Sequence, residues 1–409
     1  MRSDFTKSKA SVLLDLVRAL AALLVLVEHW RNLFFIDYPQ IQAHRAVFAP
    51  VYLLTSAGHQ AVVIFFVLSG YLISGSVFRT LDRNNWSWQT YLVHRLLRLW
   101  IVLIPGLLLC ALWDAIGIHS HLAPILYSGG AGNHMVMNVL AVHTPKIFFQ
   151  NLAFLQMILS PTFGSDGALW SLSYEFWYYI LFPLGLLTVL PKTRLWPRLL
   201  CGPLFAIVAW FVGWPILSSF PIWLLGSVLA LVPIPKFSNQ MRVLISVLYL
   251  PIFFGLAKIE SIGSVDSAIA QGITHLPLLY RDYFLALATF GLLWALLSAT
   301  SPAENSTGEH AIRKASAFSY TLYVSHTPLA VLLVAVVEGD RRWTPDPLHI
   351  LLGLALLALL LAYAYGLAIL TEFRTDRIRR WLEAKLHLKP NRLAAVSLAE
   401  EEDLERARL

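Results

Sequence analysis

The feature that most constrains this chain is a succession of long apolar segments separated by short clusters of basic residues. A helix needs roughly 20 mostly apolar residues to cross a bilayer. Ten segments meet or approach this length: 11–35, 60–79, 95–114, 168–190, 199–217, 218–233, 242–260, 282–300, 316–337 and 348–370. Of the 409 residues, 57% are hydrophobic and only 13% are charged, about half of the roughly 25% found in soluble domains. The sequence therefore predicts an all-α, polytopic integral membrane helical bundle and argues against a soluble, disordered or fibrous protein.

The distribution of Lys and Arg predicts which loops face the cytoplasm, because positively charged loops stay on the inner side of a membrane. With ten spans and both termini cytoplasmic, about 23 of the 31 basic residues fall on the inner side. The apolar segment 147–159 is too short to cross comfortably, and counting it as a span would move the basic cluster at 192–198 outside. We therefore expect it to be re-entrant or interfacial. The predicted organisation is a cytoplasmic tail (1–10), a transmembrane domain (11–370) and a cytoplasmic C-terminal tail (371–409).

Charge and motif content exclude several classes of function. The net charge of +7 comes from clusters beside apolar segments rather than from a basic stripe with stacking aromatics, so no nucleic-acid partner is expected. The loop 115–146 holds four histidines, but its H-x-H pair is weak evidence alone and no metal is predicted; the four are His119, His121, His134 and His143. The sequence contains no Walker A loop, G-x-S-x-G elbow or H-E-x-x-H motif. NTP-driven transport, serine-elbow hydrolysis and zincin chemistry are therefore unsupported.

The first apolar segment carries ionisable residues where they are costly. Such a side chain within a span costs about 2.5–3.5 kcal/mol on insertion scales, so each one needs a partner or a function. Arg18 and His29 are eleven residues apart, which places them on one helix face about 16 Å apart along the axis. Asp15 precedes Arg18 by three residues and can pair with it. The alternative is a snorkelling Arg18 and an interfacial His29.

A pair of arginines begins the third segment. The i,i+3 spacing of Arg95 and Arg98 puts both guanidinium groups on one helix face at the inner surface. Guanidinium forks bind phosphate bidentately, so an anionic cofactor could dock there. The alternative is that both residues only anchor the helix at the membrane surface.

Two later segments carry further candidates. In 168–190, Ser171, Glu175 and either Tyr178 or Tyr179 recur on one side of the predicted helix, and a carboxylate within a span is a functional candidate. The alternative is a structural ion pair with an arginine of another helix. His326 lies near the middle of 316–337, where a packing role is the alternative.

Together these segments resemble the membrane-bound acyltransferase family 3, whose members O-acylate glycans and other acceptors. Five motifs follow in the family's order: Leu14-Asp15-Leu16-Val17-Arg18 with His29, similar to its R-x10-H; Phe65-Phe66-Val67-Leu68-Ser69-Gly70-Tyr71-Leu72-Ile73; Arg95-Leu96-Leu97-Arg98; Leu169-Trp170-Ser171-Leu172-Ser173-Tyr174-Glu175; and Ser319-Tyr320 through His326. Val17 and Ala19 stand where the family commonly has glycine, and Glu175-Phe176 where it often has two acids. The groups that carry chemistry remain.

The resemblance implies transfer of an acyl group, most commonly acetyl, from acyl-CoA to a hydroxyl of a cell-surface glycan, a lipid-linked sugar or a related acceptor. It implies a multi-pass protein of the bacterial cytoplasmic (inner) membrane that needs no metal. Arg18, Arg95 and Arg98 would bind CoA, and His29 would be the general base or carry the acyl group transiently. Glu175 would orient His29 or bind the sugar. The expected substrate-binding residues are Asp15, Ser171, Tyr178 and His326.

Two rival functions follow from the same residues. A transporter or flippase for a glycan or small solute would line its path with intramembrane charges, but it predicts inverted repeats that the sequence does not show. A different membrane acyltransferase class, built on a buried His and Asn, would leave the arginine pair unexplained.

Overall fold

The computed structural model describes residues 7–131, 135–190, 195–262, 278–304 and 306–386. Its α-helices are α1 (Lys9–Phe34), α2 (Arg45–Leu54), α3 (Gly58–Asp82), α4 (Trp88–Ser120), α5 (Pro124–Tyr127), α6 (Val139–Val142), α7 (Pro145–Leu152), α8 (Trp170–Val189), α9 (Leu195–Leu229), α10 (Asn239–Ile262), α12 (Leu278–Leu297), α13 (Thr307–Ala317), α14 (Ser319–Val337), α15 (Pro347–Leu370) and α16 (Thr375–Lys385). Three short 3-10 helices complete the fold: η1 (Tyr38–Gln40), η2 (Gly167–Leu169) and η3 (Glu372–Arg374). His134, Lys192, Arg194 and the outer parts of both predicted tails lie outside the described residues.

The predicted all-α membrane bundle is confirmed. Within the described ranges the only β pairing is three isolated bridges. In the part of the chain that the structure describes, seven helical segments are long and apolar enough to cross a membrane: α1, α2 with α3, α4, α9, α10, α14, and α15 with α16. α8 and α12 match predicted spans but are not among the seven. The count of ten and the cytoplasmic placement of both termini remain predictions.

Side-chain caps start several of the helices where the sequence supplies short polar residues. The hydroxyl of Ser8 accepts from the Ser11 amide at the start of α1, and Ser87 does the same for Thr90 at the start of α4. Asp346 caps α15 by accepting from two backbone amides, with Pro347 at the first helical position. These caps satisfy amide groups that an apolar environment would otherwise leave unpaired.

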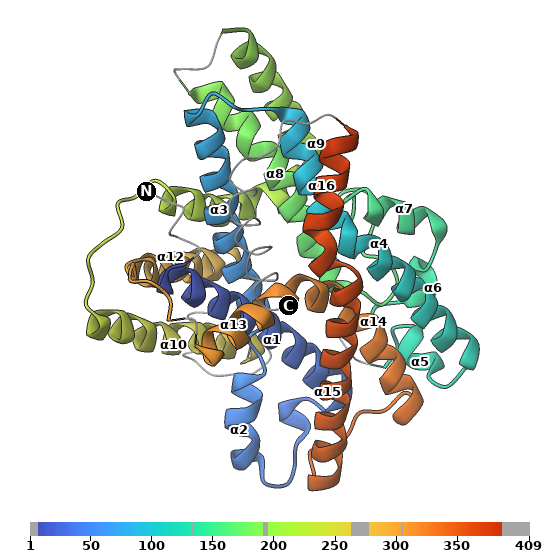
Figure 1. The fold of residues 1–409 in the computed structure, drawn as a ribbon. Helices are drawn as coiled ribbons and strands as arrows, with labels where there is room; N and C mark the ends of the chain where they lie inside the picture. The colour runs from blue at the N-terminus through green and yellow to red at the C-terminus, as the bar shows by residue number, and fades with distance from the viewer. Residues whose placement is uncertain (1–6, 132–134, 191–194, 263–277, 305, 387–409) are drawn as a thin grey trace, which may run out of the picture.

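Close packing of α3 on α9 depends on two glycines. A Cβ atom at Gly70 would overlap the carbonyl oxygen of Trp223, and one at Gly226 would overlap the carbonyl oxygen of Val67. Membrane helices without side chains at the contact approach this closely and gain van der Waals packing. Figure 1 shows α3 near the middle of the molecule, with α10 and α12 on one flank and α4 with α5–α7 on the other.

α9 contains the predicted segment 199–217 and most of 218–233, and it is broken inside. Gly213 has φ 74° and ψ 177°, outside the helical region, in a conformation that is essentially restricted to glycine. Pro215 follows two residues later and lacks an amide donor. The division therefore falls at Gly213, a few residues before the predicted boundary.

The short apolar segment 147–159 forms no spanning helix. α7 has 8 residues, a length of about 12 Å, and the chain then turns through a non-helical loop in which Phe154, Gln156 and Phe163 are buried. The buried Asn151 accepts from the Phe163 amide at 3.0 Å and donates to the Pro161 carbonyl at 3.0 Å, and Gln156 donates to the Leu169 carbonyl at 2.9 Å. Irregular backbone is tolerated at membrane depth only when protein groups satisfy it in this way.

α14 lies at the centre of the polar residues considered below. It packs against α1, α4 and α15, and most of its side chains are buried. Figure 1 shows α15 and α16 following one another from the bottom of the view towards its top, with α16 beside the start of α4. There Glu383 of α16 lies 2.6 Å from His94 Nε2 of α4.

Candidate active site

Two groups of polar residues lie along α1. The arginine cluster comprises Arg18, Arg95 and Arg98 with the carboxylates of Asp15 and Glu372; the histidine pair is His29 and His326. Arg18 and His29 belong to one helix, α1, so their eleven-residue separation fixes an axial rise of about 16 Å between the two groups.

Arg18 is held by two partners. Its Nη2 donates to Asp15 Oδ1 at 2.8 Å and its Nε donates to Ser316 Oγ at 2.6 Å, while the Ser316 hydroxyl itself donates to Asp15 Oδ1 at 3.0 Å. Arg313 Nη1 lies 3.4 Å from the other oxygen of Asp15. The predicted Asp15–Arg18 pair therefore forms, and residues of α13 complete it.

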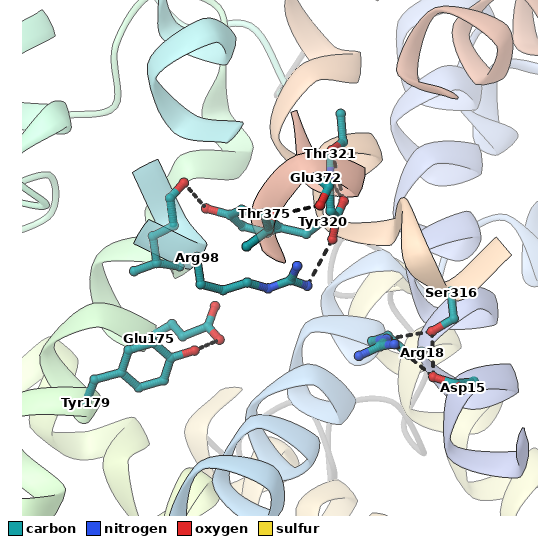
Figure 2. Close-up of polar contacts among 11 residues, drawn as sticks. Asp15, Arg18, Arg98, Glu175, Tyr179, Ser316, Tyr320, Thr321, Glu372 and Thr375 are labelled. Atoms are coloured by element: carbon teal, nitrogen blue, oxygen red, sulfur yellow. Dashed lines mark hydrogen bonds and ion pairs between the residues drawn. The ribbon is translucent and has the colours of Figure 1, made fainter. Parts of the chain in front are cut away.

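Arg98 reaches a carboxylate near the other end of the sequence. Its Nη2 lies 2.9 Å from Glu372 Oε1, and its guanidinium carbon is 5.7 Å from the centre of the Tyr320 ring. The Glu372 side chain is 2% exposed, whereas that of Arg98 is 40% exposed. Figure 2 shows the Arg98 guanidinium between Glu372 and the Arg18 group. The two guanidinium groups are close enough to repel each other electrostatically.

Arg95 lies on the same helix one turn earlier. Its guanidinium carbon is 5.6 Å from the ring centre of Tyr91 and 5.9 Å from that of Tyr179, and its Nη2 donates to Ser76 Oγ at 3.4 Å. Its buried Nε has no hydrogen-bond partner among the described residues. Arg95 thus has an unused donor, and its binding of an anion stays a prediction.

Glu175 is bonded within the bundle and faces Arg98 (Figure 2). Its Oε1 accepts from Ser69 Oγ at 3.1 Å and from the Tyr179 hydroxyl. Trp223 Nε1 donates to the same Ser69 hydroxyl at 3.2 Å. In the described part of the chain no hydrogen bond joins Glu175 to His29, so Glu175 does not orient His29 directly.

A small pocket opens between α1 and α3 beside Arg18. Its volume is about 70 Å³. Its walls are apolar except for the polar edge that Arg18 and Asp15 supply; the lining residues are Ser11, Leu14, Asp15, Arg18, Leu68 and Leu72. An apolar groove with a guanidinium at its rim suits a chain that carries a negative group.

His29 and His326 contact each other directly. His29 Nδ1 lies 2.8 Å from His326 Nε2, and the ring centres are 4.9 Å apart. His326 is fully buried, and its Nδ1 lies 2.7 Å from the carbonyl oxygen of Leu322. The hydroxyl of Thr327 is 3.3 Å from His29 Nδ1 and 3.2 Å from His326 Nε2.

We assign the tautomers of both rings from these contacts. A carbonyl oxygen only accepts, so His326 Nδ1 carries a hydrogen and donates it to Leu322. Two adjacent imidazoles in a buried site are neutral, because burial penalises the charged form and two charges would repel. His326 Nε2 is then the acceptor for the hydrogen on His29 Nδ1. This leaves the lone pair of His29 on Nε2, and both hydrogen bonds that His29 makes to described residues use Nδ1.

Ser171 and Tyr178, two expected substrate-binding residues, form bonds between helices. Ser171 Oγ lies 2.6 Å from the Tyr323 hydroxyl, which donates to the Ala168 carbonyl at 3.0 Å. The Tyr178 hydroxyl donates to the Ile216 carbonyl at 2.8 Å, and its side chain is fully buried. Of the two adjacent tyrosines, Tyr179 is the one that reaches Glu175.

A family model described as an acyltransferase domain matches residues 12–367, which is most of the chain. The chain belongs to acyltransferase family 3. No curated protein and no solved structure matches it. Among the residues that the structure describes, no group of three or more His, Cys, Asp or Glu side chains is placed to hold a metal ion.

Sequence reasoning missed several polar residues of this acyltransferase. Glu372 stands at the start of the predicted cytoplasmic tail, where burial is not expected. The one sequence signal for burial is that its two neighbours, a Thr and a Phe, carry no charge. Asp114 is fully buried on α4 and accepts from the amide and hydroxyl of Ser165 at 2.8 and 2.6 Å. His59 Nε2 lies 2.9 Å from Asp282. Their partners lie far away in the sequence, so no local spacing could reveal them.

Proposed function

We propose that this membrane acyltransferase moves an acyl group, most simply acetyl, from acyl-CoA to a hydroxyl of a cell-surface glycan or lipid-linked sugar. The observation that carries the proposal is the contact of His29 Nδ1 with His326 Nε2 at 2.8 Å, beside a His326 Nδ1 that faces the Leu322 carbonyl at 2.7 Å; from it we assign the lone pair of His29 to Nε2. His29 lies on α1 together with Arg18, whose guanidinium group faces that of Arg98. A base and an anion-binding cluster about 16 Å apart suit a donor with a phosphorylated end and a reactive thioester end.

The arginine cluster would receive the phosphates of CoA from the cytoplasm. Arg18 and Arg98 face each other, and Arg95 lies one turn before Arg98 on α4. Guanidinium groups form bidentate, charge-assisted hydrogen bonds to phosphate. The phosphate charge would also relieve the repulsion between Arg18 and Arg98. From there the pantetheine arm would follow α1 towards His29, with the small apolar pocket beside Arg18 on its way.

At the thioester end, His29 would act as general base. Its Nε2 takes the proton of the acceptor hydroxyl as that oxygen attacks the thioester carbonyl. Collapse of the tetrahedral intermediate breaks the carbon–sulfur bond, and His29 returns the proton to the leaving thiolate to give CoA and the new ester. His326 would hold His29 in the required tautomer and stabilise its cationic form, in place of the substrate-binding role expected from the sequence.

The remaining predicted site residues divide between the two groups. Asp15 would orient Arg18 rather than touch the substrate, given its bonds to Arg18 and Ser316. Glu175 and Tyr179 would flank the donor path beside Arg98, where Glu175 limits the net positive charge. Ser171 and Tyr178 would act in packing. The enzyme would work in a bacterial cytoplasmic membrane, with the acceptor on the outer side.

Mass spectrometry of envelope glycans tests this function. A deletion strain is compared with the same strain complemented with the wild-type chain or with His29→Ala. The proposal expects the deletion to remove an ester mass from an otherwise intact glycan, the wild type to restore it, and His29→Ala to insert normally without restoring it. Loss of the glycan backbone itself would favour a transporter, and full rescue by His29→Ala would remove His29 from the mechanism.

A further inference from the structure

The segment that follows the last spanning helix contributes a residue to the arginine cluster. Glu372, in η3, forms an ion pair through one carboxylate oxygen and accepts hydrogen bonds through the other. Oε1 pairs with Arg98 Nη2 at 2.9 Å. Oε2 accepts from the amide and the hydroxyl of Thr321, at 3.0 and 2.9 Å. This side chain therefore joins α4 to α14 from a third segment.

We propose that Glu372 is a positioning residue that holds Arg98 ready for the acyl donor; this inference rests on the proposed function. Arg98 has a long side chain that is 40% exposed, and an unanchored arginine loses substantial rotamer freedom when it binds a ligand. The ion pair with the buried Glu372 removes that freedom in advance. Among the described residues Glu372 engages one end of the guanidinium, so the rest of its fork remains for a phosphate.

The geometry of the two arginines supports this role. In Figure 2 the partners of Arg18, Asp15 and Ser316, lie on the side of Arg18 away from Arg98. Glu372 in turn holds the end of Arg98. Without these carboxylates the two guanidinium groups would repel each other and separate. Each arginine thus has one carboxylate that keeps it facing the other.

Glu372→Gln is the sharpest single change, because it preserves shape and removes one acceptor. A carboxamide has one oxygen and one NH₂ group. If its oxygen faces the two donors of Thr321, its NH₂ group faces the Arg98 guanidinium. In the opposite orientation its NH₂ group faces the Thr321 donors. Glutamine therefore cannot satisfy both partners.

The experiment measures initial rates with purified protein in nanodiscs, acetyl-CoA as donor and envelope glycan from a deletion strain as acceptor. Glu372→Gln is expected to raise the donor KM about tenfold or more, as small misplacements of a substrate-positioning group do, with kcat within about threefold and an unchanged acceptor KM. In an Arg98→Ala background, Glu372→Gln should raise the donor KM no further, because coupled residues are not additive. The matched control is Glu383→Gln, which removes the carboxylate that binds His94 from α16 and should leave the donor KM unchanged.

Several results would overturn the proposal. These are a donor KM equal to or below that of the wild type, a fall in kcat without a change in donor KM, an undiminished effect in the Arg98→Ala background, or the same effect from Glu383→Gln.

If Glu372→Gln does not yield folded protein, Thr321→Val tests the proposal in its place, since it removes one of the three donors to Glu372. It should raise the donor KM about threefold, as expected for one hydrogen bond, and an unchanged value would contradict the proposal. A wild-type protein that transfers no acetyl group would instead refute the proposed function itself.

Discussion

The arginine cluster and the histidine pair each include one residue of α1, Arg18 and His29, but they are held in place differently. Arg18 and Arg98 are partly exposed and are each oriented by a carboxylate, and Arg18 also by a serine hydroxyl. His29 is oriented through its Nδ1, which contacts His326 Nε2 at 2.8 Å and the Thr327 hydroxyl at 3.3 Å, and His326 in turn donates to the Leu322 carbonyl. Binding of an anion is divided between several guanidinium groups, so losing one contact should weaken it by degrees. Proton transfer depends on the orientation of one ring, so the same kind of substitution should act differently in the two groups.

The largest effect is expected from His29→Ala. Removing the base should lower kcat by roughly 10²–10⁴-fold, the usual contribution of general base catalysis, and leave the affinity for CoA unchanged. Initial rates with labelled acetyl-CoA and deacylated envelope glycan measure the first quantity. His349→Ala, a histidine paired with Asp346 at the start of α15, is the control and should behave as wild type. A similar loss in both variants would point to general destabilisation.

The next effect distinguishes the two substitutions His326→Leu and His326→Gln. Leucine removes the closer acceptor of His29 Nδ1–H and leaves only the Thr327 hydroxyl at 3.3 Å, and we expect kcat to fall about 100-fold. A glutamine oxygen can accept that hydrogen bond, so His326→Gln should recover about tenfold of the loss. The same rate assay measures both. Equal rates in the two variants would mean that His326 does not act through its hydrogen bond to His29.

In the arginine cluster, Arg18→Lys should mainly weaken binding of the donor. A lysine ammonium cannot reproduce the fork that donates to Asp15 and Ser316 together. We expect the KM for acetyl-CoA to rise about tenfold with little change in kcat. Arg342→Lys, which alters the bidentate pair with Asp37, should leave the donor KM as it is. A large fall in kcat for Arg18→Lys would place Arg18 in the chemical step.

The smallest effect is expected from Ser316→Ala. This change removes one neutral acceptor from Arg18 and leaves Asp15 in place. The donor KM should rise about two- to threefold, the range expected for one hydrogen bond, as titrated over acetyl-CoA concentration. A rise as large as that of Arg18→Lys would show that the serine, and not the carboxylate, sets the position of Arg18.

The sequence was sufficient for local features of the fold and site. Asp15 and Arg18 are three residues apart on one helix, so their pairing follows from helix geometry alone. The segment 147–159 is too short for a span, and α7 with its return loop is what that length allows. The motif residues Gly70 and His326 were found as patterns, but their physical roles needed the packing of α3 on α9 and of α14 on α1.

Features that join distant segments were not predictable. His29 and His326 are 297 residues apart, and the sequence offers no reason to pair them rather than His29 with Glu175. Glu372 belongs by composition to a charged tail, yet its side chain is almost completely buried. The reason is that α15 packs against α14 and the turn after it, η3, packs against α4. Tyr178 and Tyr179 are equivalent by spacing, and only the neighbouring helices decide that Tyr179 reaches Glu175.

The most direct test of the account compares CoA binding with acetyl transfer in His29→Ala and Arg98→Ala. Both variants and the wild type are purified in nanodiscs, and CoA affinity is measured by isothermal titration calorimetry beside the transfer rate from acetyl-CoA to envelope glycan. The account predicts that His29→Ala binds CoA as the wild type does and transfers almost nothing, whereas Arg98→Ala loses affinity and regains rate at high acetyl-CoA. Wild-type transfer by His29→Ala, or wild-type CoA affinity in Arg98→Ala, would contradict it.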